Sequence, residues 1–356
     1  MVVALEIMEE KYQWLPCEGE LAREARLRGC KLAVSEVLIP SVRPAACHLP
    51  LGTKGRLFPR KELFMDYTHC TLCPRRCGVD RTAGERGFCG MGDTLRIARA
   101  AVHYGEEPAI AGSFGAGAVF FSGCSLGCVY CQNEEVSHGG LGKDVTPERL
   151  REIFLELIDQ GVQCIDLVTP THFLPSLLPA LSPKLEVPVV YNCGGYETVE
   201  TIKALEGLVD VYLPDMKYSD AALAGRLSRA PDYPEVAMAA IREMVRQTGP
   251  FQMEDGVLTR GVLVRHLILP GQIDNSLGVL DFLSTFAPGE ILLSLMCQYT
   301  PMPQTKNLGD LSRPITRAEY DAVLSYLWLL NLQDGYTQDF QSVGQQYIPQ
   351  WDLEGV

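Results

Sequence analysis

Cysteines are concentrated in a short part of this chain, and that concentration limits what it can fold into more than any other feature. Seven of the 13 cysteines lie between residues 70 and 131, in two tight groups. Disulfide frameworks are typical of small secreted domains, and an odd number of cysteines in 356 residues does not fit that class. Grouped cysteines in a reducing compartment indicate metal ligands instead. The sequence therefore predicts metal binding in a cytoplasmic protein.

The remaining composition narrows the class of protein further. Apolar residues make up 47% and charged residues 21%, as in ordinary globular chains, so disorder is excluded as the main state. The formal charge of −13 argues against non-specific binding of nucleic acid, which needs a basic surface. No apolar run approaches the roughly 18 residues that span a bilayer, and acidic residues interrupt the N-terminus too early for a secretory signal. We expect neither a membrane nor a nucleic acid as partner.

Strands and helices alternate from about residue 116 onward. Thr146 and Pro147 are typical of a helix start, and apolar residues at helical spacing follow them. Repeated β-α-β units predict a parallel sheet that stays open or closes partly into a barrel. The predicted strands are 118–121, 164–168, 187–191, 211–213, 262–269 and 291–296. The predicted organisation is an N-terminal extension (1–66), a cysteine-rich module (67–105), an α/β core with a partial (β/α)6 barrel (106–331) and a C-terminal tail (332–356).

The second cysteine group has the pattern C-x3-C-x2-C, formed by Cys124, Cys128 and Cys131. It follows the first barrel strand, on the face where parallel α/β folds collect their ligands. Three thiolates from one loop suit three irons of a [4Fe–4S] cluster and leave the fourth iron without a protein ligand. A structural zinc site would need a fourth protein ligand. Gly123 and Gly127 allow the loop to bend tightly.

This loop resembles the signature of the radical S-adenosylmethionine (SAM) enzymes, with Tyr130 in the aromatic position before the last cysteine. Over residues 67–331 the chain is most similar to the branch related to pyruvate formate-lyase activating enzymes, in an uncharacterised activating-enzyme-like group. The resemblance implies reductive cleavage of SAM to a 5′-deoxyadenosyl radical, hydrogen-atom abstraction from a substrate, and an oxidoreductase or lyase activity. It also implies an electron donor such as flavodoxin or ferredoxin. The cofactor performs the difficult chemistry, while the protein supplies orientation.

The resemblance assigns SAM contacts to the ends of successive strands. Asp215 and Lys217 match the Asp-x-Lys of the activating enzymes, and Arg265 lies in a strand that ends in Pro-Gly as in the family. The stretch after the second strand departs from the family's Gly-Gly-Glu, so the methionine amino group must be held by backbone carbonyls or by threonines. The full set of implied contacts is Tyr130, Thr169, Thr171, Asn192, Asp215, Lys217, Arg265, Gln298 and Tyr299.

Two further cysteines lie at predicted strand ends, where a thiol could exchange a hydrogen atom with a substrate radical. They are Cys193 and Cys297. The alternative, which we favour, is that each is a small buried hydrophobic residue. Asp215 and Lys217 likewise have an alternative interpretation as a simple ion pair, and Arg265 as a structural anchor for a carboxylate.

The first cysteine group consists of Cys70, Cys73, Cys77 and Cys89, with turn-forming residues between them. Four thiolates in twenty residues meet the requirements of tetrahedral sulfur coordination. Ligand chemistry alone does not separate zinc from an auxiliary iron–sulfur cluster. A full set of four ligands indicates a structural or electron-relay role.

The sequence leaves the identity of the substrate undecided. Similarity to activating enzymes implies a backbone glycine of a partner glycyl-radical enzyme. Those enzymes carry extra cysteines after the radical motif, whereas this chain has them before it, so direct modification of a peptide or small molecule is nearly as well supported. The alternative from another class is a non-catalytic interaction protein with zinc in both cysteine groups.

Overall fold

The computed structural model describes residues 12–14, 65–340 and 350–356. These residues all belong to one compact unit. The predicted N-terminal extension, 1–66, lies outside the described residues except for 12–14 and 65–66. None of the described helices is both long and apolar enough to cross a membrane.

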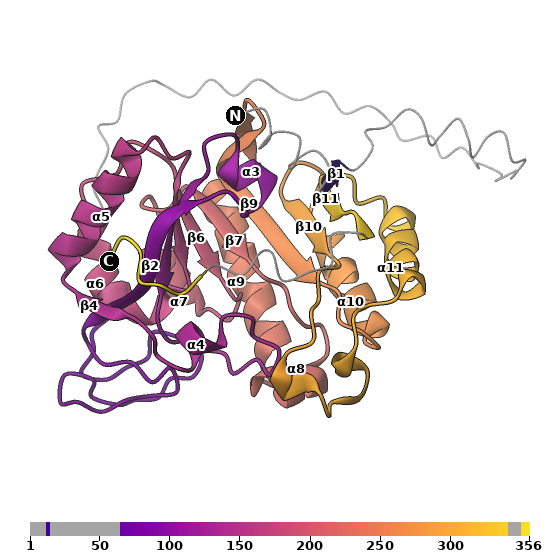
Figure 1. The fold of residues 1–356 in the computed structure, drawn as a ribbon. Helices are drawn as coiled ribbons and strands as arrows, with labels where there is room; N and C mark the ends of the chain where they lie inside the picture. Colours follow the sequence, from indigo (N-terminus) through magenta and orange to yellow (C-terminus); the bar gives the residue numbers. More distant parts are fainter. Residues whose placement is uncertain (1–11, 15–64, 341–349) are drawn as a thin grey trace, which may run out of the picture. The chain divides into compact units, whose positions relative to one another are not determined.

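A single twisted sheet carries the fold, in the strand order β1-β11-β10-β9-β7-β6-β5-β3-β2-β4 (Figure 1). From β3 to β11 each strand is parallel to its neighbour, and β2 and β4 continue the sheet antiparallel. The strands are β1 Tyr12–Trp14, β2 Leu95–His103, β3 Ala116–Phe121, β4 Lys143–Val145, β5 Ile165–Val168, β6 Val189–Cys193, β7 Val211–Pro214, β8 Gln252–Glu254, β9 Val257–Leu267, β10 Leu292–Met296 and β11 Gly335–Gln338.

Helices connect the parallel strands, as right-handed β-α-β units require. They are α3 Pro108–Ala111, α4 Glu134–Ser137, α5 Pro147–Asp159, α6 Leu174–Ala180, α7 Val199–Ala204, α8 Ala221–Ser228, α9 Tyr233–Thr248, α10 Ile273–Leu283 and α11 Arg317–Leu329. The predicted start of α5 is confirmed, because the Thr146 hydroxyl caps the helix by accepting from the Arg149 amide at 3.2 Å.

The predicted partial barrel is confirmed. Its six predicted strands correspond to β3, β5, β6, β7, β9 and β10. The sheet also extends past the predicted core, 106–331, because β2 pairs with β3 and β11 pairs with β10. The division of the chain into four segments remains a prediction.

Side chains alternate between two faces along each barrel strand. On β6, Val189, Tyr191 and Cys193 pack into the large apolar cluster that also contains residues of α5 and α9. Val190 belongs to a second cluster together with residues of α3. Because one face is covered by helices, the other face lines the barrel interior. That interior also carries polar side chains, which position the site.

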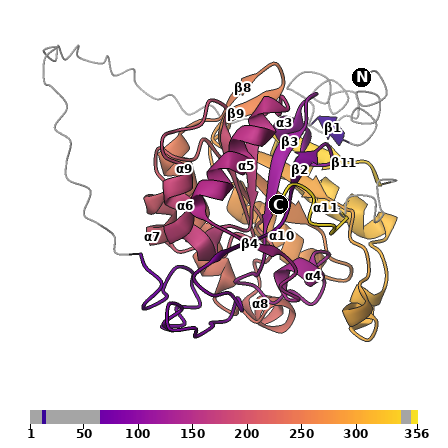
Figure 2. The same cartoon turned by 60° about the vertical axis from the view of Figure 1, so that its left-hand side comes forward.

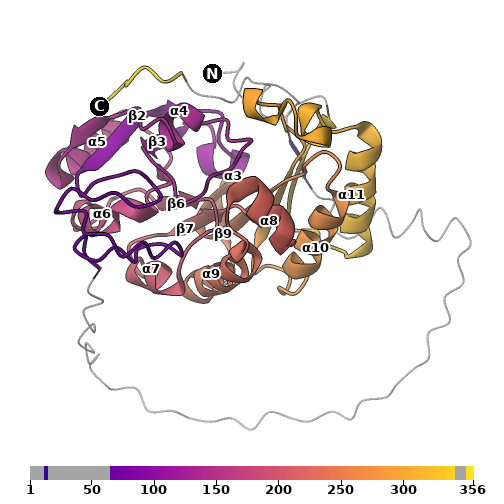
Figure 3. The same cartoon turned by 90° about the horizontal axis from the view of Figure 1, so that it is seen from below.

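The cysteine-bearing loops gather at one end of the sheet. Figure 1 shows the loops of residues 65–94 at the end where α4 and α8 lie, and α3 at the opposite end. Figure 3 looks onto the loop-bearing end. The C-terminal residues lie along β2, where the Ala100 amide donates to the Glu354 carbonyl at 2.9 Å (Figure 2). This end of the sheet therefore brings several distant segments of the chain together.

Candidate functional site

The loop of Cys124, Cys128 and Cys131 begins three residues after β3. Gly123 turns the chain with a φ of +86°, and a Cβ at this position would lie 2.5 Å from Met91 Cγ. Backbone bonds from Gly127 to Ser228 and from Val129 to Leu227 then tie the loop to the end of α8. The loop is thus fixed in place by the protein around it.

The three thiols are half-buried and lie close to one another. Burial raises the pKa of the Cys124 and Cys128 thiols, and the neighbouring cysteines raise that of Cys124 further. Lys217 opposes this shift at both thiols. Protein groups alone therefore leave these thiols protonated, whereas bound metal cations would stabilise their thiolates.

Three thiols from one loop match the ligand number of a [4Fe–4S] cluster with one open iron. Within the described residues, no three histidine, cysteine, aspartate or glutamate side chains converge closely enough to hold one metal ion. A [4Fe–4S] cluster binds each thiolate through a different iron, so its ligands need not converge on one point.

A hydrogen-bonded chain of hydroxyl groups ends on Cys128. The Ser228 hydroxyl donates to Cys128 Sγ at 2.9 Å. Ser228 Oγ lies 2.6 Å from the hydroxyl of Tyr218, which lies 2.7 Å from that of Tyr130. Because Ser228 has one proton, donation to sulfur makes it the acceptor from Tyr218. The chain is therefore polarised toward the sulfur.

A cavity of about 240 Å³ opens beside this loop. Six of the predicted SAM contacts line it together with two of the predicted cluster ligands. The lining residues are Cys128, Tyr130, Cys131, Gln132, Asn133, Asp215, Lys217, Arg265, Leu267, Met296, Gln298, Tyr299 and Thr300. Residues from the loop of Cys124, Cys128 and Cys131 and from the ends of β7, β9 and β10 thus meet around one space.

An ion network forms the polar wall of the cavity. Asp215 accepts from Lys217 Nζ at 2.5 Å and from Arg265 Nε at 2.9 Å. Burial alone would raise the pKa of the Asp215 carboxyl, but the charges of Arg265 and Lys217 outweigh burial and lower it. Arg265 also donates to Asn192 Oδ1 at 2.6 Å and to Glu106 Oε1 at 3.1 Å. At neutral pH the wall therefore presents one anion held between two cations.

Three predicted contacts do not line the cavity. Asn192 lies behind its wall, where it holds Arg265. The buried Thr171 hydroxyl donates to Glu197 at 2.7 Å. Thr169 has a positive φ of 60°, and its amide donates to the Asn192 carbonyl at 2.8 Å.

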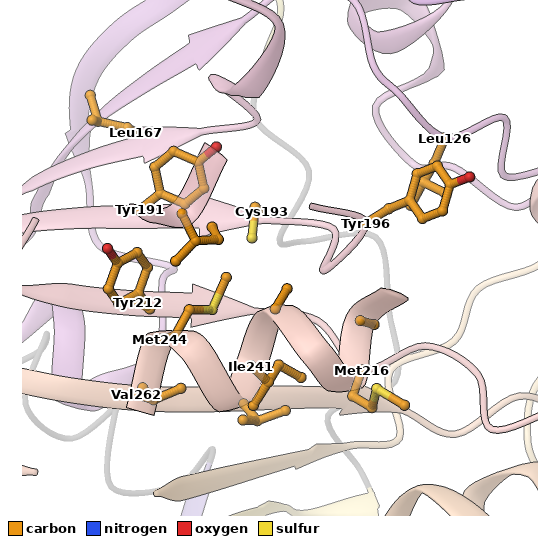
Figure 4. Close-up of a cluster of buried hydrophobic side chains, with 14 of the residues drawn as sticks. Leu126, Leu167, Tyr191, Cys193, Tyr196, Tyr212, Met216, Ile241, Met244 and Val262 are labelled. Carbon is orange, nitrogen blue, oxygen red and sulfur yellow. The ribbon is translucent and has the colours of Figure 1, made fainter. Parts of the chain in front are cut away.

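Cys193 and Cys297 pack in the apolar cluster between the sheet and the helices. Figure 4 shows Cys193 among Tyr191, Tyr212 and Met244. Neither thiol is among the residues that line the cavity. Their surroundings are those of small buried hydrophobic residues.

The first cysteine group forms a compact loop beside the second. Cys70 and Cys73 are buried, while Cys77 and Cys89 are half-buried. The Phe88 amide donates to Cys77 Sγ at 3.3 Å. Burial raises the pKa of the Cys73 thiol to about 12, with smaller effects of Cys89 and Cys70 in the same direction. Burial also raises the pKa of the Cys89 thiol, and Cys70 and Cys77 act in the same direction, so the four thiols are neighbours.

Arg75, which lies between Cys73 and Cys77, connects the two cysteine loops. It donates to the Ser125 carbonyl at 2.8 Å, to the Ser228 carbonyl at 3.1 Å and to the Arg229 carbonyl. Its guanidinium also lies 3.8 Å from the centre of the Phe88 ring. Arg75 thus joins the two loops.

The buried Arg81 connects the first cysteine loop to the segment after β5. Arg81 donates to the carbonyls of Gly92 and His172. Burial lowers the pKa of His172 to about 4, so the neutral ring donates from Nε2 to the Ser122 carbonyl at 2.6 Å. His172 is a structural residue in this arrangement.

Sequence reasoning missed Ser228, Tyr218, Arg75 and Glu106. Arg75 carried a usable signal, because it lies inside the Cys73–Cys77 spacing. Ser228 reaches Cys128 across 100 residues, Tyr218 reaches Tyr130 across 88 and Glu106 reaches Arg265 across 159, and no local pattern marks these contacts.

A family model and a curated relative both match this chain. The family model described as the radical SAM superfamily matches residues 118–283. The uncharacterized protein MJ0674 of Methanocaldococcus jannaschii is 29% identical over 277 residues, covering 75% of this chain and 76% of that protein.

Solved structures share a lower sequence identity with this chain. SuiB of Streptococcus suis, bound to its precursor peptide SuiA, shares 13% identity at a TM-score of 0.41, covering 61% of this chain and 46% of SuiB. SuiB bound to S-adenosylmethionine gives the same identity and TM-score, with 48% of that chain covered. A domain of a pyruvate-formate lyase-activating enzyme from Bacteroides vulgatus shares 13% identity at a TM-score of 0.32, covering 54% of this chain and 90% of the domain. This chain spans less than half of the SuiB chains. The match to the radical SAM family model covers residues 118–283, which include the Cys124 loop and make up slightly less than half of the chain.

Proposed function

We propose that this protein is a radical SAM iron–sulfur enzyme in which Cys124, Cys128 and Cys131 hold a [4Fe–4S] cluster. The observation that carries the proposal is the cavity in which Cys128 and Cys131 face strand-end side chains from three parts of the barrel. When bound, the cluster would supply the electron that cleaves SAM to a 5′-deoxyadenosyl radical for hydrogen-atom abstraction.

The protein's own residues would bind and orient SAM. Lys217 offers an ammonium group for the SAM carboxylate, and Asp215 keeps that ammonium charged, because the carboxylate helps to raise the pKa of Lys217 against the effect of burial. Gln298 and Tyr299 bring polar groups from the end of β10. Tyr130 contributes a buried ring whose hydroxyl is already bonded. Thr169, Thr171 and Asn192 would act from behind the wall rather than from within the cavity.

The Cys70, Cys73, Cys77 and Cys89 group is proposed to hold a second metal centre. Four thiols suit either a zinc ion or an auxiliary iron–sulfur cluster. We propose that this centre relays electrons from a donor such as flavodoxin or ferredoxin, because Arg75 holds the two cysteine loops together. Metal analysis by anomalous scattering at the iron and zinc edges would identify the metal.

One anaerobic experiment tests the function. The full chain is reconstituted with iron and sulfide, reduced with dithionite and mixed with SAM, and 5′-deoxyadenosine is measured by chromatography. We expect brown protein that forms 5′-deoxyadenosine, and loss of this product in Cys128→Ala. Cys164→Ala, a buried cysteine outside both groups, is the matched control and should behave as the wild type. A colourless protein that does not respond to SAM would instead support the zinc-binding alternative.

A further inference from the structure

The last residue of β11, Gln338, contacts the end of β10 through its buried side chain. Gln338 Oε1 accepts from the Cys297 backbone amide at 2.9 Å, and Gln338 Nε2 donates to Gln298 Oε1 at 2.7 Å. The backbone carbonyl of Gln338 also accepts from the Tyr320 hydroxyl. Gln338 is therefore held through both its backbone and its side chain. It is not among the residues that line the cavity, whereas Gln298 is.

These contacts determine which end of the Gln298 side chain faces the cavity. A backbone amide can only donate, so the Gln338 atom that meets Cys297 must be the amide oxygen. The nitrogen of Gln338 then faces Gln298, and because that nitrogen can only donate, Gln298 must turn its oxygen toward it. The NH₂ group of Gln298 is therefore the end that remains for the cavity.

The NH₂ group of Gln298 lies near a weak acceptor of the protein. Gln298 Nε2 is 3.7 Å from Met296 Sδ, and a thioether sulfur accepts hydrogen bonds only weakly. An NH₂ group carries two donors. A ligand with an oxygen or nitrogen acceptor at this corner of the cavity would form a stronger bond than the sulfur does. The corner is thus suited to recognise an acceptor atom.

The side chains around Gln298 suit the nucleoside part of SAM better than its charged part. Met296 is apolar, and the rings of Tyr130 and Tyr299 lie with their centres 6.2 Å apart at an angle of 59°. Aromatic and apolar side chains favour contact with a flat base. The charged groups of the cavity lie in the ion network of Lys217, which the proposed function assigns to the SAM carboxylate.

We propose that Gln338 is a positioning residue, which holds the Gln298 amide so that its NH₂ group donates to an acceptor atom of the SAM nucleoside. This rests on the proposed radical SAM function. Gln338 acts through Gln298 and does not touch the ligand. In Gln338→Met, bound SAM would force Gln298 Oε1 against an apolar side chain, whereas in the empty site the amide can turn that oxygen toward water. Loss of the donor should therefore weaken binding, because a buried acceptor without a partner is costly.

The test is a binding measurement on the full chain with its clusters reconstituted, under anaerobic conditions and without reductant. The dissociation constant of SAM is measured by calorimetry, and we expect Gln338→Met to raise it at least about fivefold. Gln298→Met should also weaken binding. The double variant should bind SAM no more weakly than Gln298→Met alone, because the effect of Gln338 runs through Gln298. The control Gln333→Met, at a glutamine that bonds Asn331 away from the cavity, should bind as the wild type.

A second ligand identifies the part of SAM that is recognised. 5′-Methylthioadenosine keeps the nucleoside and lacks the amino and carboxylate groups, so its affinity should fall by the same factor in Gln338→Met. A loss for SAM without a loss for 5′-methylthioadenosine would overturn the assignment to the nucleoside.

Thermal unfolding of each variant checks that it is folded. If Gln338→Met does not fold, Gln338→Glu at pH 8 replaces it, since a carboxylate still accepts from the Cys297 amide but cannot donate to Gln298. A folded Gln338 variant that binds SAM within about twofold of the wild type overturns the proposal. An undiminished loss in the Gln298→Met background overturns it as well, because it would show a merely structural role. Wild-type protein that does not bind SAM at all would instead refute the proposed function, and this inference with it.

Discussion

The hydroxyl chain that ends on Cys128 predicts the effect of a single substitution on the proposed cluster. Ser228 is fully buried and donates to Cys128 Sγ at 2.9 Å. Ser228→Ala removes this donor while keeping the size of the side chain nearly unchanged. A hydrogen bond to a charged group contributes about 1.5–3 kcal/mol. We assume that this bond stabilises the reduced cluster more than the oxidised cluster by about a third of that energy. The reduced cluster therefore loses about 0.5–1 kcal/mol more stabilisation than the oxidised one.

This difference converts to a measurable change in potential. A one-electron couple shifts by about 59 mV for each 1.4 kcal/mol, so the reduction potential should fall by about 20 to 40 mV. The sign follows because donors to sulfur stabilise the more negative, reduced cluster. The assay is a redox titration followed by electron paramagnetic resonance on anaerobic protein.

Two further variants test whether the change in reduction potential comes from this hydrogen-bonded chain. Tyr218→Phe removes the hydroxyl behind Ser228, so it should shift the potential in the same direction by a smaller amount. Ser325→Ala, at an exposed serine that bonds only within α11, is the control and should cause no shift. An unchanged or more positive potential in Ser228→Ala would refute the reasoning.

Three other predictions test the surroundings of the cysteine loops and the barrel. Arg75→Ala removes donors to Ser125, Ser228 and Arg229, so we expect a loss of about 2–4 kcal/mol in the free energy of unfolding and less iron per chain. The control Arg76→Ala breaks an exposed ion pair at 3.6 Å and should change neither quantity. Equal effects of the two substitutions would contradict the role of Arg75 in joining the cysteine loops. Gly123→Ala combines a positive φ with a contact at 2.5 Å to Met91, so iron content after reconstitution should fall, and full loading would show that the loop tolerates a side chain. Glu319 accepts from Arg313, the Gly271 amide and Thr316, and these bonds lower its pKa, so Glu319→Gln should cost about 1–2 kcal/mol at pH 7 in urea unfolding. Because the folded pKa is depressed, this stabilisation is present above the unfolded pKa of about 4.3 and is lost as the pH falls. The difference between wild type and Glu319→Gln should therefore shrink at pH 3, and a constant difference would contradict the role of the charge.

The barrel could be predicted from the sequence because its elements carry local signals. Thr146 and Pro147 mark a helix start, and β3 and β5 are short apolar runs bounded by glycines or helix ends. The residues that form the cavity were also predictable in part, because Lys217 and Arg265 end strands that a parallel sheet must bring to one face.

Contacts between distant segments could not be predicted in the same way. Ser228 reaches Cys128 across 100 residues, and Glu106 reaches Arg265 across 159. Neither follows from spacing, because each depends on how a loop or a helix end packs on the finished barrel. The same applies to β2, whose antiparallel pairing with β3 places the first cysteine group beside the second.

The central claim is that the cluster has three cysteine ligands and one iron that is free to bind SAM. Mössbauer spectroscopy of anaerobic, ⁵⁷Fe-labelled protein, recorded with and without SAM, tests it directly. We expect SAM to change the signal of a single iron of the Cys124–Cys131 cluster, and Cys128→Ala to abolish this response. A spectrum that SAM leaves unchanged, with every iron bound by sulfur alone, would contradict it.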